Sequence, residues 1–326
     1  MPELRFTIIY IVCLFMAGII GYAISKGSTC CVAAVMEMVQ KRRVRRFLSF
    51  LLCSATVAII LMPIVWFDKD HTDLLPAYRL GWASLLGGAF YGIGALINGA
   101  CNFGTIDRLS AGDTRYLFLF PGLIGGACLG SLLNIDTPPR TSSLIAEPGP
   151  IAYIWMALCL ILLVSFTIAS IRHKRERGTP GKPVAFYMTT IGALTALITI
   201  ALGPWHYTRI AVVATNDWLA TSAGHVAILA GLMGAVIIGA LITAIREKRF
   251  KLRAPTLSGA LYSTLGGALM GASLLLIPGG NDGIILSGLP SLSLSAVFAY
   301  TTMCLTIAFM ILISERLMKI THKKTP

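Results

Sequence analysis

Charged side chains are scarce in this sequence: they make up 13% of the 326 residues, whereas 56% of the residues are hydrophobic. Soluble domains carry about 25% charged residues, and the mean hydropathy of this chain is +0.78. We therefore expect an all-α integral membrane protein, because apolar helices satisfy their own backbone hydrogen bonds inside a bilayer.

Several motifs are also missing. The chain has no G-x-x-x-x-G-K-[ST] run, so it lacks the phosphate-binding loop of nucleotide-driven transport. It has no C-x-x-C pair of the kind used by thiol oxidoreductases. No histidine lies near the polar-flanked cysteines described below, which disfavours a metal site. We expect no cofactor, no metal and no catalytic residue, and hence not an enzyme.

The net charge of +13 does not indicate a nucleic-acid partner. The basic residues fall in short blocks between apolar runs, as membrane orientation requires. Four such blocks are expected to be cytoplasmic: 41–46, 172–177, 246–253 and 316–324. Two acid-bearing segments are expected to face outward: 68–73 and 136–147. Nine crossings satisfy all of them if the N-terminus is outside and the C-terminus is cytoplasmic.

Length and hydropathy predict nine membrane spans. They cover approximately residues 5–24, 47–66, 79–97, 116–134, 151–171, 184–203, 224–245, 258–277 and 291–314. Four shorter stretches are predicted to be re-entrant helices: 27–40, 98–112, 204–220 and 278–290.

An internal repeat relates the two halves of the chain. A shift of 179 residues carries Gly87-Gly88-Ala89 onto Gly266-Gly267-Ala268, and it carries Asn102 onto Asn281. The first repeat covers about 5–134 and the second about 184–314, joined by a linking helix at about 151–171. A single linking span reverses the second unit, which predicts one transmembrane transport domain over 1–326 with an inverted-topology repeat.

The segment from Asn98 to Gly104 is the strongest candidate site. It follows an apolar span directly, and its glycines and amides break the helix at membrane depth, which is tolerated where the chain lines a cavity or is covered by protein. Cys101 lies between the amides, and its neutral thiol is a weak donor on a polarizable sulfur. The residues expected to contact substrate here are Asn98, Gly99, Cys101, Asn102 and Gly104. Arg108 attracts an anion, pairs with Asp107 or Asp113, or extends its side chain to the membrane interface.

A second cysteine site follows the first span. Ser28 and Thr29 precede an apolar helical run, which is an N-cap signature and would aim a positive helix end at a bound anion. Adjacent cysteines cannot both face one point from a helix, so at most one of Cys30 and Cys31 is expected to contact the substrate. In the second repeat, Gly280 and Asn281 are the corresponding candidates, and Asp282 is expected to turn away or to cap a helix.

These motifs resemble the YeeE/YedE family of sulfur-transport membrane proteins. The resemblance rests on Lys26 to Cys30, on Gly87-Gly88-Ala89 leading into 98–104, on Gly224-His225, and on Gly266-Gly267 leading into 278–283. It implies a nine-span inverted repeat in the bacterial inner membrane that passes thiosulfate along three cysteines. Two of those positions match Cys30 and Cys101, and the third falls on Gly280, which has no thiol.

The leading interpretation is a permease for a small sulfur-containing anion, most simply thiosulfate. Its passage is either passive, with consumption of the ion inside as a pull, or driven by an ion gradient. One alternative is a membrane thiol oxidoreductase that uses Cys30 with Cys31 or Cys101. Another is a component that delivers sulfur to a cytosolic carrier protein docked on the basic loops. Membrane lipid is the remaining expected partner.

Overall fold

The structure is a computed structural model that describes residues 2–67, 73–135, 137–177, 184–206, 208 and 223–324. Within these residues, nine helical spans are long and apolar enough to cross a membrane, which confirms the predicted number and the all-α class. The nine long helices are α1 (Pro2–Gly27), α3 (Arg45–Phe67), α4 (Trp82–Asn98), α6 (Leu119–Leu132), α7 (Pro150–Arg177), α8 (Val184–Leu202), α10 (Ala223–Arg246), α11 (Leu257–Leu276) and α13 (Leu294–Lys324).

Shorter helices occupy three of the four stretches predicted to re-enter the membrane. They are α2 (Cys31–Lys41), α5 (Asn102–Ser110) and α12 (Gly280–Gly283), and α12 continues into a π-helical turn η3 (Ile284–Gly288). Most of the fourth stretch, 204–220, lies outside the described residues. Re-entry itself stays a prediction. The remaining elements are a 3-10 helix η2 (Thr114–Phe118) and a small antiparallel ribbon of β1 (Ala77–Tyr78) and β2 (Arg140–Thr141).

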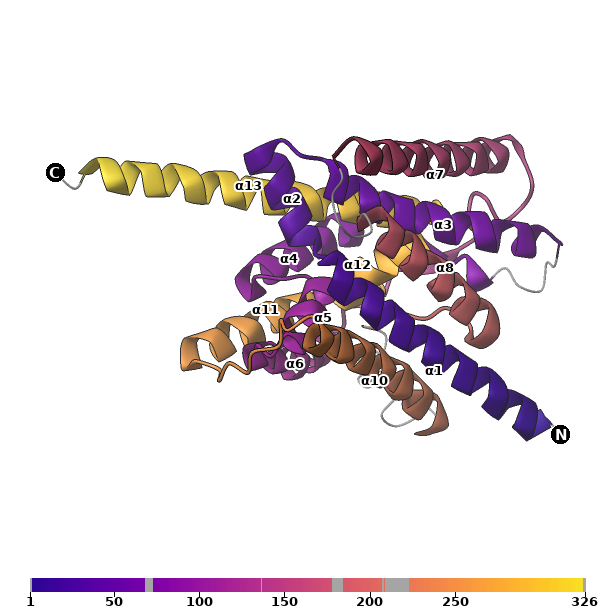
Figure 1. Cartoon of the computed structure of the whole chain (residues 1–326), viewed down its shortest axis with the longest axis horizontal. Helices are drawn as coiled ribbons and strands as arrows, with labels where there is room; N and C mark the ends of the chain where they lie inside the picture. The colour runs from indigo at the N-terminus through magenta and orange to yellow at the C-terminus, as the bar shows by residue number, and fades with distance from the viewer. Residues whose placement is uncertain are drawn as a thin grey trace.

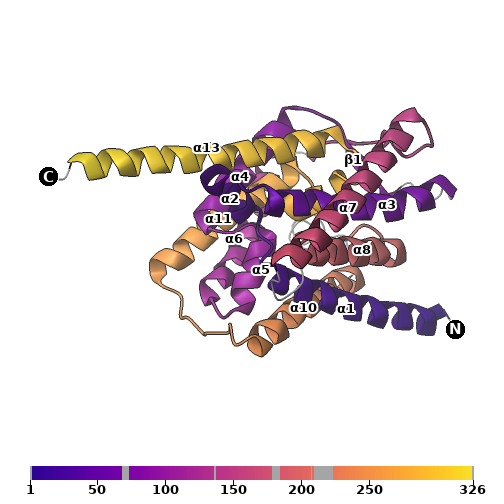
Figure 2. The ribbon, with the colours of Figure 1, turned by 45° about the horizontal axis from the view of Figure 1, so that its top comes forward.

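Two of the short helices, α5 and α12, lie among the long ones near the centre of the view, and α2 lies towards the edge of the bundle (Figure 1). α12 is near the centre of the view with α5 beside it, and the two elements are in contact. α7 runs along the outside against α3, and its span is only 11% buried, as expected for a linking helix that faces lipid. The two chain ends point to opposite sides of the bundle (Figure 2).

Helix packing follows the repeat found in the sequence. The shift of 179 residues relates α1 to α8, α3 to α10, α4 to α11 and α6 to α13. The contacts come in matching pairs: α1 packs on α10 as α8 packs on α3, and α6 packs on α11 as α13 packs on α4. The division into two repeats stays a prediction, and this reciprocal packing is what two related units would produce.

α4 and α11 cross directly, and small residues make the crossing possible. A methyl group on Gly94 would lie 2.7 Å from the Gly266 carbonyl oxygen, and one on Gly266 would lie 2.6 Å from the Gly94 carbonyl oxygen. Glycine at such crossings lets helix backbones approach closely in a membrane. This contact places the C-terminal end of α4, where the candidate site begins, against the second repeat.

Candidate functional site

The helix is interrupted between α4 and α5 by a glycine in the left-handed conformation. Gly99 ends α4 with φ 78°, a conformation that strains residues with a side chain. The buried Asn98 side chain holds the break together, since its Nδ2 donates to the Ala100 carbonyl oxygen at 2.9 Å and to Thr105 Oγ1 at 3.0 Å. α5 then begins with Cys101 as its N-cap residue. The predicted break is therefore present, and it delivers Cys101 to a helix N-terminus.

A similar break between α1 and α2 positions Cys30. Ser28 adopts φ 44°, and α2 starts at Cys31 with Cys30, in extended conformation, as its N-cap residue. The prediction that Ser28 or Thr29 caps this helix is wrong, because the helix starts two residues later than the serine would require. The Thr29 hydroxyl is buried and has no hydrogen-bond partner in the described part of the chain.

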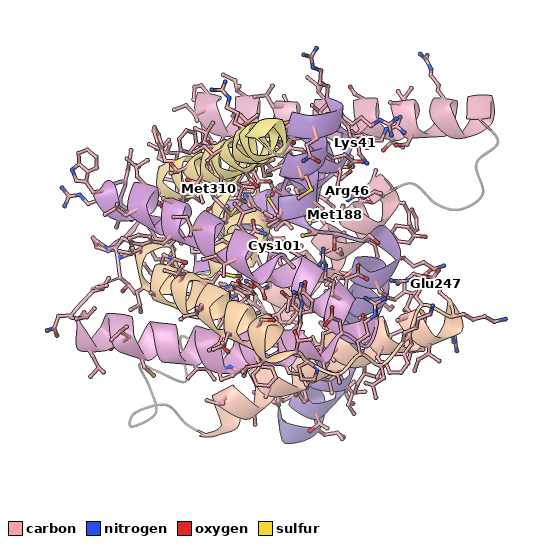
Figure 3. All side chains as sticks on the ribbon, turned by 90° about the vertical axis from the view of Figure 1, so that its left-hand side faces the viewer. Lys41, Arg46, Cys101, Met188, Glu247 and Met310 are labelled. Carbon is pink, nitrogen blue, oxygen red and sulfur yellow. The ribbon has the colours of Figure 1, made fainter. Side chains whose placement is uncertain are left out.

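The two cysteines meet in the protein interior. The Cys101 thiol donates to Cys30 Sγ across 3.9 Å, and the backbone N–H of Cys31 donates to Cys101 Sγ at 3.1 Å. Cys101 is fully buried and Cys30 is 7% exposed. A disulfide needs a sulfur–sulfur distance of about 2.05 Å, and both thiols are free. In Figure 3, Cys101 lies near the centre of the view and Glu247 lies at its edge.

Gly104 leaves the room that this meeting needs. A methyl group at residue 104 would lie 2.6 Å from Cys30 Sγ and 2.9 Å from its Cβ. Glycine one turn into α5 thus lets the Cys30 side chain rest against the helix backbone. The structure therefore brings together Cys30, Cys101 and Gly104 as the sequence predicted.

The adjacent cysteines separate as expected. Cys31 Sγ faces away from the pair and lies 3.8 Å from the Tyr300 hydroxyl on α13. Only one thiol of the Cys30-Cys31 pair therefore contacts Cys101 in the structure.

Buried polar groups without partners gather at the start of α12. Both side-chain atoms of Asn281 are buried and make no hydrogen bond to any described residue, and the same holds for Asn102 Oδ1 and the Tyr91 hydroxyl. Tyr91 lies on α4, Asn102 begins α5, and Asn281 is the second residue of α12. An unmet buried polar group is costly unless a water or a ligand satisfies it. These groups form a polar centre between the repeats.

Tyr91 was not identified from the sequence, where it reads as one aromatic residue in an apolar span. Its ring occupies the space beside Gly280: a methyl group there would lie 2.9 Å from Tyr91 Cε2, and Gly280 has φ 56°. A cysteine at residue 280 would therefore clash with this ring. The spacing of residues along the chain does not predict this contact, because Tyr91 and Gly280 lie far apart in the sequence.

The Asp282 carboxylate accepts hydrogen bonds from two separate segments of the chain. Its Oδ1 accepts from Asn102 Nδ2 at 2.6 Å, its Oδ2 accepts from the Thr208 backbone N–H at 3.0 Å, and the Thr208 hydroxyl lies 3.2 Å from both oxygens. Asp282 does not cap α12, since Gly279 is the N-cap residue and Asp282 lies inside the helix, whereas the alternative that Asp282 turns away from an anion path stays a prediction. Arg209, the next residue after Thr208, lies outside the described residues.

Two arginines converge on one tyrosine on the side of the thiols predicted to be cytoplasmic. Arg108 Nη1 donates to the Tyr116 hydroxyl at 2.8 Å, and Arg115 donates to the same oxygen. Arg108 lies one helical turn after Gly104, on the same face of α5. It does not pair with Asp107, whose carboxylate lies 3.3 Å from Arg249. This cluster places positive charge at one end of the site.

A cluster of ion pairs joins the C-terminal parts of α1, α5 and α10. It consists of Lys26, Asp107, Glu247 and Arg249, and we call it the ion clasp. Glu247 accepts from Lys26 and, at 3.0 Å, from Arg249, which also donates to Ser25. Partial burial opposes ionisation of Glu247, but the hydrogen bonds from Lys26 and Arg249 outweigh it and lower the pKa of Glu247.

A pocket of about 360 Å³ opens on the opposite side, beside β1 and β2. Its lining includes His206, Arg140, Pro278, Gly279 and Gly283. The His206 ring packs on Gly279, where a methyl group would lie 2.5 Å from Nε2. This pocket therefore reaches the N-terminal end of α12, next to the polar centre. No group of three potential metal ligands occurs among the described residues.

Comparison with known proteins identifies the family of this chain but not its substrate. A search of curated proteins finds no match to this chain. The family model described as sulphur transport matches residues 26–309, a range that contains both cysteines, the polar centre and the ion clasp. The match covers well over half of the sequence and agrees with the resemblance to YeeE/YedE proteins. The chain therefore belongs to the sulphur transport family.

Proposed function

We propose that the protein is a permease for a small sulfur-containing anion, most simply thiosulfate, which passes between the thiols of Cys30 and Cys101. The observation that carries this proposal is the buried pair of free thiols, 3.9 Å apart, at the N-termini of α2 and α5. Helix N-termini favour anions, because their free N–H groups and dipoles point outward.

Thiols suit passage better than charged side chains do. A neutral thiol is a weak donor, so it can hydrogen-bond the soft terminal sulfur of the ion without holding it tightly. Conduction requires sites from which an ion can leave. The unpartnered side chains of Asn281 and Tyr91 supply donors for the oxygen end of the same ion.

The described elements arrange a route across the protein. The outer pocket reaches Gly279, the polar centre follows at Asn281, and the thiols lie beyond it. Arg108 and Arg115 lie past the thiols and attract an anion towards the cytoplasmic mouth. Asn98, Gly99 and Gly104 position the thiols, and Asn102 and Gly280 border the polar centre.

The test is uptake of labelled thiosulfate by cells that lack other routes for it. We expect Cys101→Ala to abolish most uptake, and Cys53→Ala to retain it, because Cys53 is a buried thiol on α3 outside this site. Expression and detergent stability of each variant are measured in parallel. Equal uptake by wild type and Cys101→Ala would refute the proposed route.

The same thiol distance favours one alternative. Cys30 and Cys101 are close enough that a shift of about 2 Å would allow a disulfide, as a membrane thiol oxidoreductase with an electron acceptor would require. Differential alkylation with mass spectrometry distinguishes the two functions. A permease keeps both thiols reduced while thiosulfate is transported, whereas an oxidoreductase shows them changing state with its substrate. Delivery to a cytosolic carrier stays a prediction from the basic loops.

A further inference from the structure

Asp282 differs from every other ionisable acidic or basic residue that the structure describes. It is fully buried, whereas the other described aspartates, glutamates, lysines and arginines are at least partly exposed. Burying a carboxylate in the centre of a membrane protein is expensive, and such residues mark ion and proton pathways. The polar contacts of Asp282 with Asn102 and Thr208 involve neutral groups.

No Lys or Arg of the described chain forms an ion pair with Asp282. The titratable groups that face it are Tyr91 from α4, Cys101 at the start of α5, and His206 from the segment after α8, which packs on the flanking Gly279 and Gly283. α11 contributes the apolar Leu274 beside Gly280. Arg209 lies outside the described residues.

The position of Asp282 lies between the outer pocket and the thiols. Gly279 and Gly283, on either side of it in sequence, line the pocket. Asn102, which donates to its carboxylate, follows Cys101 directly. An anion that moves from the pocket to the thiols therefore passes a negative charge, unless that charge is neutralised.

We propose that Asp282 carries a proton inward with each sulfur-containing anion, so that the protein is a proton–anion symporter; this inference rests on the permease function proposed above. A proton from the outer pocket binds the carboxylate, the neutral acid lets the anion reach the thiols, and the proton leaves to the cytoplasm, which restores the carboxylate. One O–H bond forms and the same bond breaks, and one proton and one anion cross together.

Coupling to a proton also lowers the free energy needed to accumulate the anion inside. An inside-negative potential of 100 mV opposes accumulation of each negative charge by about 50-fold, and a dianion carries two such charges. A co-transported proton cancels one of them and adds the pH gradient as a driving force.

The experiment measures thiosulfate and protons together in vesicles that contain the purified full chain. A pH-sensitive dye is sealed inside, potassium with valinomycin clamps the potential, and labelled thiosulfate is added outside. Because one carboxylate binds one proton, we expect the lumen to acidify by about one proton per thiosulfate, and uptake to accelerate as the outer solution is made more acidic.

Variants locate the proton site. Asp282→Asn is expected to admit thiosulfate without acidification and without dependence on outer pH. Asp107→Asn removes a carboxylate near the cytoplasmic end of α5 and is expected to keep the proton-to-anion ratio. If Asp282→Asn does not fold, the wild-type ratio still decides whether protons move.

The experiment distinguishes failure of the symport inference from failure of the permease function. Wild-type uptake with an unchanged lumen pH, or a proton ratio that persists in Asp282→Asn, overturns the symport inference and leaves the permease standing. Absence of thiosulfate uptake by the wild-type protein overturns both.

Discussion

Single residues set the chemistry of the route. Gly104 leaves space for the Cys30 side chain, and the Tyr91 ring occupies the space beside Gly280. The two thiols are hydrogen-bonded but too far apart to form a disulfide. On the proposed route, the sulfur end of an anion would meet the thiols, and its oxygen end would meet the hydroxyl of Tyr91 and the amide of Asn281. Selectivity then depends on both ends of the ion.

Tyr91→Phe tests the oxygen end. The change removes a buried hydroxyl that bonds to no described residue and keeps the ring against Gly280, so the fold is expected to keep its stability. Loss of one hydrogen bond to a charged ligand costs about 1.5–3 kcal/mol, which corresponds to roughly a 10- to 100-fold increase in the KM for thiosulfate. Initial uptake rates over a concentration series measure it.

Tyr262→Phe is the matched control for this change, since Tyr262 is 57% exposed on α11. An unchanged KM in Tyr91→Phe would exclude the hydroxyl from the route. A fall in thermal stability without a change in KM would instead assign Tyr91 a packing role.

Helix ends, at the scale of elements, carry the polar contacts of the site. α4 ends at a left-handed glycine, α5 and α2 begin with cysteines as N-cap residues, and α12 is a single turn that continues as a π-helix. π-helical turns are frequent at functional sites because they reposition side chains within a helix. The ion clasp then ties the C-terminal half of α5 to α1 and to the end of α10.

The clasp predicts a pH-dependent stability. Because hydrogen bonds from Lys26 and Arg249 lower the pKa of Glu247, the folded state holds this carboxylate ionised more strongly than the unfolded state does. Its contribution is therefore present above the ordinary value of 4.5 and is lost as the pH falls through the lowered folded-state pKa. Thermal unfolding in detergent should show wild type more stable than Glu247→Gln near neutral pH.

The two proteins should converge in stability as the solution becomes more acidic than pH 4.5. Glu315→Gln is a suitable control, because Glu315 lies on α13 away from the clasp and accepts from Gln40 at the surface. A stability difference that does not change with pH would contradict the assigned role of the ion pairs.

At the scale of the whole molecule, the proposed route has one end on each side of the membrane. The basic blocks predict that the clasp and Arg108 face the cytoplasm, and that β2 and the pocket beside it face outward. This orientation stays a prediction, and it is directly measurable.

Single cysteines introduced at Thr141 and Lys248 report the orientation. Thr141 lies in β2 and Lys248 in the turn after α10, both at the surface. In a background with the exposed native Cys128 replaced by Ser, an impermeant maleimide should label Thr141→Cys in intact cells. It should label Lys248→Cys only after the membrane is opened. The reverse pattern would invert the predicted topology and the direction of the route.

Much of the fold was predictable because it depends on local composition. Nine apolar runs became nine long helices, and the polar interruptions at Gly99 and Gly279 became chain breaks, since a membrane helix cannot hold such residues in an unbroken run without loss. Helix geometry also limited the Cys30-Cys31 pair to one thiol at the site, whereas the choice of Cys30 came from the family resemblance. Boundaries and caps were less accurate: α2 starts at Cys31 and not at the serine or threonine before it.

The sequence by itself determined the spans, the breaks and the thiols that lie at them, because each depends on residues near one another along the chain. The tertiary structure decided the contacts of Asp282 with Asn102 and Thr208, the placement of the Tyr91 ring against Gly280, and the partners of Arg108. Most of these contacts join elements from different parts of the chain, and the angle and depth at which those elements pack come from close packing of small residues such as Gly94 and Gly266. Hydropathy and local motifs do not encode that geometry.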